Sequence, residues 1–271
     1  LEIERGQITG LIGPNGAANP TFFNLPTGFD KPDTGHALLN GESIDNRAPN
    51  RLAENGLVRT FQLTKSLTKL SVIENMKLGA THQRGENFWR GLAKPLWSSQ
   101  ERKITDRADA LLERFKLDHM RDEYAGTLSG GQRKLLEMAR ALMTEPDLIM
   151  LDEPMAGVNP ALTQSLLGHV MELAAEGITI VFVEHDMDVV RDISDWVVVM
   201  AEGEIIAEGP HDTISANKAV IDAYLGSHHD APLTLEEEDE WLAEDRAIFL
   251  KEEEEHDKIM SELEERKHHR G

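Results

Sequence analysis

The sequence predicts an α/β fold in which helices flank a mixed β-sheet. Short apolar runs of strand length, at 7–12, 147–152 and 177–183, alternate with longer segments of helical periodicity. The run before Asp152 is apolar throughout, which is typical of a parallel strand buried on both faces. The last two runs end in charged side chains, and open α/β sheets bind ligands at such carboxyl ends.

The composition sets bounds on this fold. The 271 residues are enough for one large α/β domain, or for a domain with a smaller subdomain. The absence of cysteine excludes disulfides, thiolate metal sites and a cysteine nucleophile, and is compatible with a reducing cytosol. No run approaches the ~20 apolar residues that span a bilayer, and no signal peptide is visible. We therefore expect any membrane role to come through a partner.

The charge is strongly negative and unevenly distributed. The net charge is −21, and residues 230–271 alone hold sixteen acidic side chains against six basic ones. Such a balance argues against nucleic acid as a partner. It does not exclude a nucleotide, because backbone amides and one or two cations can make a phosphate site locally.

The N-terminal segment predicts a hairpin followed by a phosphate-binding loop. Residues 1–4 alternate as a strand would, Arg5-Gly6 predicts a turn, and 7–12 predicts the next strand. The glycine-containing segment 13–21 follows this strand directly. Its position is that of a phosphate-binding loop.

The second half of this loop departs from the general pattern, which has Gly, Lys and then Ser or Thr. The sequence has Ala18, Asn19 and Pro20 there. Asn19 replaces the lysine that would reach the phosphates. Pro20 replaces a Mg²⁺-binding hydroxyl and has no backbone N–H to donate. We expect weakened ATP binding, which Thr21, one residue further along, does not restore, and Pro26 should break the following helix.

A helical subdomain is predicted at about 71–145. Ser71 should cap a helix over Val72–Ala80, with Glu74 completing a capping box. Residues 104–115 have the apolar spacing of an amphipathic helix. Before this block, residues 57–62 predict a strand that ends in Gln62.

Two glycines at the start of a helix predict an anion site. Leu128-Ser129-Gly130-Gly131-Gln132 precedes a helical run at 135–143. The first amides of a helix are unpaired and lie at its positive end, so glycines there let the backbone approach a phosphate. Asp152 and Glu153 at the end of the later strand suit a Mg²⁺ site and a base for water.

The C-terminal part predicts a helix at 161–175, a strand ending before His185, and a closing hairpin at 195–210. A short helix ends at Gly226. Residues 230–271 carry apolar side chains at a seven-residue spacing on a very acidic background. This predicts either a helix that packs on the domain or a partner, or a solvated tail.

These motifs resemble those of the nucleotide-binding subunits of ABC transporters. Leu128–Gln132 matches the family signature, Leu148–Glu153 matches its Walker B strand with the catalytic glutamate, and Gly13–Ala17 matches the start of its phosphate loop. Residues 59–62 and 219–226 resemble the branched-chain amino acid importers within the family. The resemblance covers residues 1 to about 226, so we expect a nucleotide-binding domain at 1–229 and an extension at 230–271.

The resemblance implies a P-loop NTPase fold, with ATP held between the loop of one subunit and the signature of another. It also implies roles for named residues. Glu153, His185 and Gln62 would be catalytic, and Asp152 with Gln62 would hold Mg²⁺. The residues that would contact ATP are Gly13, Pro14, Asn15, Gly16, Ala17, Ala18, Asn19, Pro20, Thr21, Ser129, Gly130, Gly131 and Gln132.

The implied partners are a second ATPase subunit, two membrane-spanning permease subunits and, indirectly, a periplasmic or extracellular substrate-binding protein. The implied location is the cytoplasmic face of the membrane. In the family a preceding segment supplies an aromatic residue that stacks on adenine. The sequence starts after that point, so we expect either that it is truncated or that the base is held less well.

Three functions follow from these motifs. The first is an importer ATPase subunit for branched-chain amino acids. The second is a regulatory or remnant subunit that assembles without hydrolysing ATP, because of Asn19 and Pro20. The third is the ATPase of another ABC system, such as lipopolysaccharide export, although residues 59–62 and 219–226 favour the importers.

Overall fold

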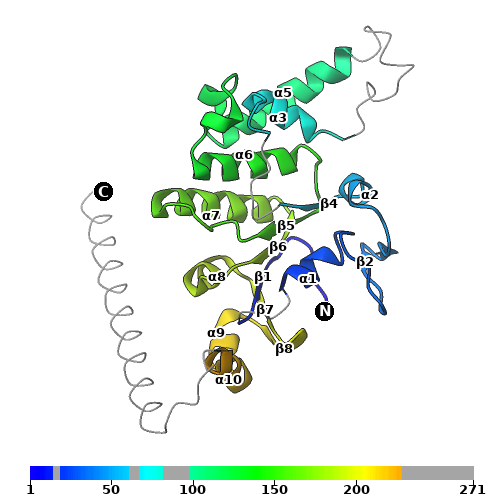
Figure 1. Cartoon of the computed structure of the whole chain (residues 1–271), viewed down its shortest axis with the longest axis vertical. Helices are drawn as coiled ribbons and strands as arrows, with labels where there is room; N and C mark the ends of the chain where they lie inside the picture. The colour runs from blue at the N-terminus through cyan, green and yellow to red at the C-terminus, as the bar shows by residue number, and fades with distance from the viewer. Residues whose placement is uncertain (15–18, 61–66, 82–97, 228–271) are drawn as a thin grey trace, which may run out of the picture. The chain divides into compact units, whose positions relative to one another are not determined.

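A computed structural model of the chain describes residues 1–14, 19–60, 67–81 and 98–227 (Figure 1). The chain divides into two units, Leu1–Tyr224 and Leu225–Gly271. The predicted extension at 230–271 lies outside the described residues, so both of its alternatives stay open. Within the described ranges, no helix combines the length and the apolar character needed to cross a membrane.

The secondary structure alternates between strands and helices, as the sequence predicts. The strands are β1 (Ile8–Ile12), β2 (Leu38–Leu39), β3 (Glu42–Ser43), β4 (Leu57–Arg59), β5 (Leu148–Asp152), β6 (Thr179–Val183), β7 (Trp196–Ala201) and β8 (Glu204–Gly209). The helices are α1 (Asn19–Asn24), α2 (Pro49–Glu54), α3 (Val72–Leu78), α5 (Ser98–Arg114), α6 (Gly130–Leu142), α7 (Pro160–Ala175), α8 (Met187–Ile193), α9 (His211–Ser215) and α10 (Lys218–Ser227). Short 3-10 turns, η3 (Asp118–Met120) and η4 (Ala125–Thr127), precede α6.

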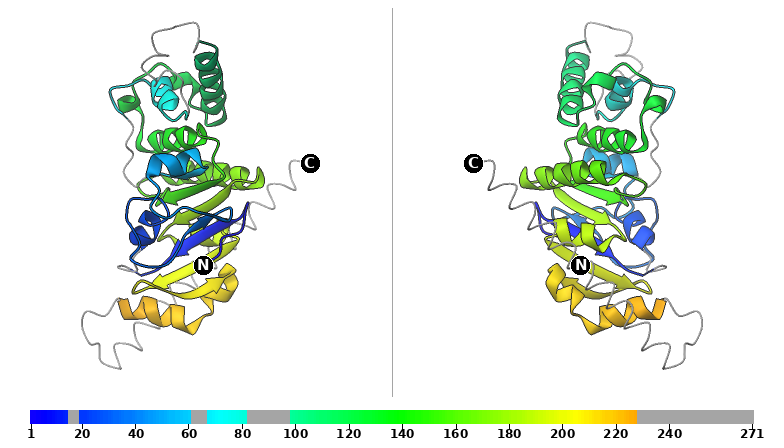
Figure 2. Two further views of the ribbon diagram at one scale, coloured as in Figure 1. Left: turned by 90° about the vertical axis from the view of Figure 1, so that its right-hand side faces the viewer. Right: turned by 90° about the vertical axis from the view of Figure 1, so that its left-hand side faces the viewer.

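The main sheet is mixed, which confirms the predicted fold class (Figure 2). Its strand order is β4-β5-β6-β1-β7-β8. The pairs from β4 to β7 are parallel, and only β7 and β8 form an antiparallel pair, the predicted closing hairpin. Because the parallel strands run the same way, the segments that follow β1, β5 and β6 leave the sheet at one edge.

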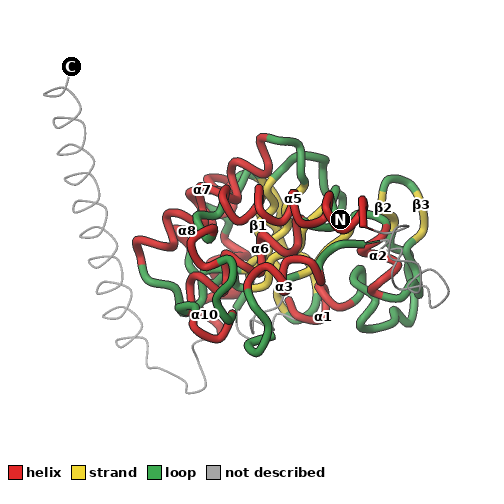
Figure 3. Tube along the Cα trace, turned by 90° about the horizontal axis from the view of Figure 1, so that it is seen from above, coloured by secondary structure: helices red, strands yellow, loops and turns green. Residues whose placement is uncertain are grey.

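Alternate residues of each strand enter two different apolar cores, one on each face of the sheet. One core joins the sheet to α6, α7 and α8, and the other joins it to α1 and α2 (Figure 3). On β6, for example, Ile180 and Phe182 enter the first core, whereas Val181 and Val183 enter the second. The continuous apolar runs in the sequence therefore arise from burial on both faces.

Gly10 allows α8 to approach β1 closely. A Cβ at this position would lie 2.8 Å from the Ser194 Oγ and 3.2 Å from the Phe182 Cζ. A side chain here would force the helix and strand apart. The close packing fixes the path of β1 just before the phosphate loop.

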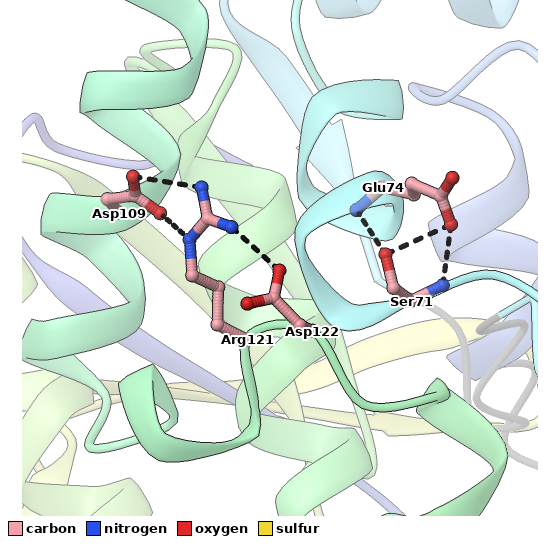
Figure 4. A network of polar contacts seen from close by, with 5 residues as sticks. All are labelled: Ser71, Glu74, Asp109, Arg121 and Asp122. Carbon is pink, nitrogen blue, oxygen red and sulfur yellow. Dashed lines mark hydrogen bonds and ion pairs between the residues drawn. The ribbon is translucent and has the colours of Figure 1, made fainter.

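The helices α3, α5 and α6 lie within the range proposed as a helical subdomain, at about 71–145, and they pack on one another. The predicted capping box at the start of α3 is present: the Glu74 N–H donates to the Ser71 Oγ (3.3 Å), and the Ser71 N–H donates to the Glu74 carboxylate (2.8 Å) (Figure 4). The start of α3 is also bonded to the chain that approaches α6, because the Val72 N–H donates to the Glu123 carbonyl (2.9 Å).

Arg121 ties this approaching segment to α5. Its guanidinium contacts the Asp109 carboxylate through Nε at 2.7 Å and the Asp122 carboxylate through Nη1 at 2.7 Å (Figure 4). The contacts of this segment with α3 and, through Arg121, with α5 fix the part of the chain that leads into the predicted signature.

Some boundaries differ from the sequence prediction. Residues 1–4 form no strand, and no described segment pairs with them, so the expected N-terminal hairpin is not found. The strands β2 and β3, of two residues each, form a separate antiparallel pair that the sequence analysis did not predict. The helix after the loop ends at Asn24, just before Pro26, as the proline predicts.

We predict that Ser71→Ala lowers stability by about 1 kcal/mol, because the Glu74 N–H loses its acceptor. For a domain of this size the melting temperature should fall by about 2–4 °C. Thermal unfolding followed by circular dichroism measures the change. Ser71→Thr keeps an acceptor and is the control; equal losses in the two variants would contradict the assigned cap.

Candidate functional site

The predicted site residues gather where the parallel strands end. Gly13 follows β1, Asp152 is the last residue of β5, and Glu184 and His185 follow β6. In the strand register Asp152 lies opposite Val183, the last residue of β6. The predicted acids and the predicted histidine therefore emerge next to one another.

The start of the phosphate loop is described, but its centre is not. Gly13 is buried and Pro14 is partly buried. Asn15, Gly16, Ala17 and Ala18 lie outside the described residues, as does Gln62. Asn19 and Pro20 begin α1, and Thr21 follows them on that helix with an exposed side chain. The roles predicted for the loop and for Gln62 stay predictions.

Asp152 is held by a buried arginine that the sequence analysis did not assign to the site. The Arg59 Nη2 lies 2.7 Å from the Asp152 Oδ2, and the side chains are only 8% and 14% exposed. The Arg59 Nη1 also donates to the Asn24 Oδ1 on α1 (2.6 Å). The guanidinium lies 5.5 Å from the centre of the Phe23 ring. The available signal was an arginine directly after the apolar pair Leu57-Val58 of a predicted strand.

The described residues do not fit a Mg²⁺ ion as they stand. The Asp152 carboxylate already carries a guanidinium counter-ion, and Pro20 has no hydroxyl to offer. Within the described ranges, no three His, Cys, Asp or Glu side chains cluster in a way that could hold a metal. The metal roles of Asp152 and Gln62 stay predictions.

Glu153 adopts a left-handed backbone conformation, with φ at 45°. A non-glycine residue in this region is strained, and it persists where its surroundings fix it. Three contacts do so: the Glu153 N–H donates to the Val183 carbonyl (3.1 Å), Lys134 Nζ donates to the Glu153 carbonyl (2.9 Å), and the carboxylate meets His185 Nε2 at 3.3 Å. The structure thus brings together two of the three predicted catalytic residues.

Glu184 is a second unassigned residue of the site. It is 5% exposed, and its carboxylate accepts a hydrogen bond from the Met155 N–H (2.8 Å). Burial raises the pKa of the Glu184 carboxyl, the Met155 and His185 N–H groups lower it, and the nearby Glu153 charge raises it. Glu184 therefore links the strand that carries His185 to the turn after Glu153.

The signature residues begin α6. Ser129 is its N-cap: the Gln132 N–H donates to the Ser129 Oγ (3.2 Å), and the Ser129 N–H donates to the Gln132 Oε1 (2.9 Å). The sequence analysis did not identify this capping box, although Ser and Gln three residues apart is its pattern. Ser129 and Gly130 are exposed, so the start of α6 is open to a ligand.

Gly130 and Gly131 differ in their surroundings. A Cβ on Gly130 would meet only the Gly157 carbonyl, at 4.0 Å, whereas a Cβ on Gly131 would overlap the Leu162 side chain of α7. The packing at Gly131, together with the Lys134 contact to Glu153, connects α6 to the end of β5. The two motifs thus belong to one continuous region.

Two family models match parts of the chain. A family model described as "ABC transporter" matches residues 1–156, and one described as "Branched-chain amino acid ATP-binding cassette transporter" matches residues 204–230.

Curated relatives resemble most of the chain. A "Probable branched-chain amino acid transport ATP-binding protein LivG" of Archaeoglobus fulgidus is 42% identical, over 84% of this chain and 88% of its own length. A "High-affinity branched-chain amino acid transport ATP-binding protein BraF" of Pseudomonas aeruginosa is 40% identical, over 83% and 89%. The Escherichia coli K12 protein named LivG is 39% identical over the same shares.

Two solved structures of ATP-binding cassettes from ABC transporters resemble the chain. A nucleotide-free cassette superposes with a TM-score of 0.72 at 39% identity, over 83% of this chain and 90% of that one. A cassette in its ADP conformation has a TM-score of 0.72 at 40% identity, over the same shares.

We predict that Glu184→Gln changes how stability depends on pH. Because burial raises the folded-state pKa above the ordinary value of 4.5, the folded chain holds this proton more tightly than the unfolded chain. The native chain should therefore lose stability relative to Glu184→Gln as pH rises through the folded-state pKa. Melting temperatures of both proteins between about pH 4 and 8 test this; a constant difference would contradict it.

We also predict that the two signature glycines respond differently to alanine. Gly131→Ala should cost about 1–3 kcal/mol, because Leu162 has to move. Gly130→Ala should stay within about 0.5 kcal/mol of the native chain. Chemical denaturation of the two variants is the measurement, and each serves as the control for the other. Equal stabilities would show that Leu162 does not fill the space beside α6.

Proposed function

The chain belongs to the family of ABC transporter ATP-binding proteins, and on that premise we propose that it is the ATP-binding subunit of an importer for branched-chain amino acids. The observation that carries the proposal is agreement along the chain: relatives at about 40% identity bear that transport function in their names, and the model matched at 204–230 belongs to the same group. The residues at the strand ends and at the start of α6 supply the chemistry.

The two parts of the site are proposed to serve different ATP molecules. The exposed start of α6, with Ser129 and Gly130, would bind the phosphates of ATP held by a second ATPase subunit. Glu153 would act on ATP bound by this chain, as the acceptor for the proton of the attacking water. His185 lies 3.3 Å from the Glu153 carboxylate and would orient it toward the terminal phosphate.

The altered loop makes the two sites unequal. Asn19 brings no positive charge, and Pro20 brings neither a hydroxyl nor an N–H. A hydrogen bond to a charged group contributes about 1.5–3 kcal/mol, and about 1.4 kcal/mol corresponds to tenfold in affinity. The site built on this chain's own loop should therefore bind ATP weakly, while its signature still completes the partner's site.

The remaining partners follow from the family. A second ATPase subunit would complete both sites, two permease subunits would form the path through the membrane, and a substrate-binding protein would deliver the amino acid. The chain would lie on the cytoplasmic face of the membrane, bound to the permease subunits. ATP-driven closure of the ATPase pair would then change the conformation of the permease.

A second candidate function is a subunit that assembles without hydrolysing ATP. The observation in its favour is the same pair, Asn19 and Pro20. The two candidates differ in whether the chain's signature supports turnover at the partner's site. If the chain is an importer subunit, leucine uptake should depend on Gly130. If the chain only assembles without supporting hydrolysis, it should not.

In the assembled transporter, the proposal predicts that substitutions at the two sites change leucine uptake to different extents. Gly130→Asp in this chain should abolish most ATP-dependent leucine uptake into vesicles, because a carboxylate would repel the partner's phosphates. Glu153→Gln in this chain should leave uptake nearly unchanged while the native loop is present. With Asn19→Lys and Pro20→Thr added, ATP hydrolysis should rise and then become sensitive to Glu153→Gln.

Gly168→Asp is the matched control, because it adds the same charge on α7 where a Cβ has no neighbour within 4 Å. Uptake that survives Gly130→Asp would favour the non-hydrolysing subunit. Unchanged hydrolysis after the double reversion would contradict the interpretation of Asn19 and Pro20.

A further inference from the structure

Lys134 on α6 contacts the proposed catalytic glutamate, although none of the proposed steps uses its side chain. The Lys134 Nζ donates a hydrogen bond to the Glu153 carbonyl at 2.9 Å, across 19 residues of sequence. Lys134 lies in the second turn of α6, and Ser129 is the N-cap of the same helix. One side chain therefore joins the helix proposed to serve the partner's ATP to the residue proposed to act on this chain's own ATP.

The backbone of Glu153 is held from two sides. Its conformation is left-handed, with φ at 45°, and a non-glycine residue keeps such a conformation where its surroundings enforce it. The Glu153 N–H donates to the Val183 carbonyl (3.1 Å), and the Glu153 carbonyl accepts from the Ala156 N–H (3.2 Å) as well as from Lys134. The Ala156 bond lies within the turn after β5, whereas the Lys134 bond comes from another element. Lys134 thus fixes this turn relative to α6.

The carboxylate end of Glu153 is held less firmly. It lies 3.3 Å from the His185 Nε2, and the His185 side chain is 53% exposed. A contact between charged groups that is open to solvent contributes little, because water competes with it. The direction of the Glu153 carboxylate therefore depends mainly on the backbone that carries it.

The contact from Lys134 has the strength and the support that positioning requires. A hydrogen bond donated by an ammonium group is charge-assisted, and it is roughly twice as strong as one between neutral groups. The bond is also partly buried, which strengthens it relative to a bond in water. The residues that follow on α6 hold the helix in the main core: Leu135, Leu136 and Met138.

We propose that Lys134 is a positioning residue for Glu153, and that it holds the carboxylate where it can accept the proton of the attacking water in this chain's own site. The inference rests on the proposed function. It makes the geometry of one ATP site depend on the helix whose first residues serve the other.

Lys134→Met tests this proposal, because it removes the donor and keeps an unbranched side chain. In the isolated native chain, hydrogen exchange at the Glu153 and Ala156 amides should become at least about threefold faster. In the assembled transporter with Asn19→Lys and Pro20→Thr, the turnover number of the hydrolysis that depends on Glu153 should fall about 10- to 100-fold, with KM for ATP unchanged. Lys134→Arg keeps a cationic donor and should recover part of this loss.

Lys103→Met is the matched control, because it removes the same charge from an exposed position on α5. It should change none of these quantities. A second control adds Lys134→Met to Glu153→Gln in the reverted transporter, where no carboxylate is left to position. The remaining hydrolysis should then not fall further. An equal loss with and without the carboxylate would assign Lys134 a structural role only and overturn the proposal.

The other outcomes are equally decisive. Unchanged exchange at Glu153 and Ala156 would overturn the contact, and faster exchange with an unchanged turnover number would overturn the positioning role. If the double reversion produces no hydrolysis that depends on Glu153 while exchange responds as expected, the failure lies with the proposed function, and the role given to Lys134 falls with it.

Discussion

The parallel pairing of β4, β5, β6 and β1 is the constraint on which the rest of the site depends. Parallel strands deliver their carboxyl ends to a single edge, so Gly13, Asp152 and His185 are neighbours in space although they are far apart in sequence. Burial on both faces keeps the strands in register, because a shift by one residue would exchange the two cores. The positions of these residues at the edge therefore depend on this packing.

Charged groups at this edge are compensated individually. Arg59 neutralises Asp152, Lys134 stabilises the strained turn at Glu153 through its carbonyl, and the Met155 N–H satisfies Glu184. Each partner comes from a different element, so the edge is connected to β4, to α6 and to the turn after β5. Buried charges are costly unless paired, and breaking one pair here would strain several elements together.

The sequence predicted the mixed sheet, the cap at Ser71 and the helix end before Pro26, because each depends on local patterns that a few residues determine. It also placed Glu153 and His185 directly at the ends of two predicted strands, and in the structure their side chains lie 3.3 Å apart. It did not predict the roles of Arg59 or Glu184. Their contacts join segments distant in sequence, and an arginine or a glutamate has no pattern that identifies such a partner. The strand expected at 1–4 failed because alternation is not enough where no partner strand pairs with it.

The unequal packing of the two signature glycines has a consequence for how the gene would diverge. Leu162 occupies the space beside Gly131, so purifying selection for a folded domain alone would retain that glycine in a lineage that had abandoned transport. Gly130 has no such structural restraint and would accumulate replacements once its ligand was gone. Among descendants of this gene, the first glycine is therefore the informative marker of a working transporter, and the second records only that the domain still folds.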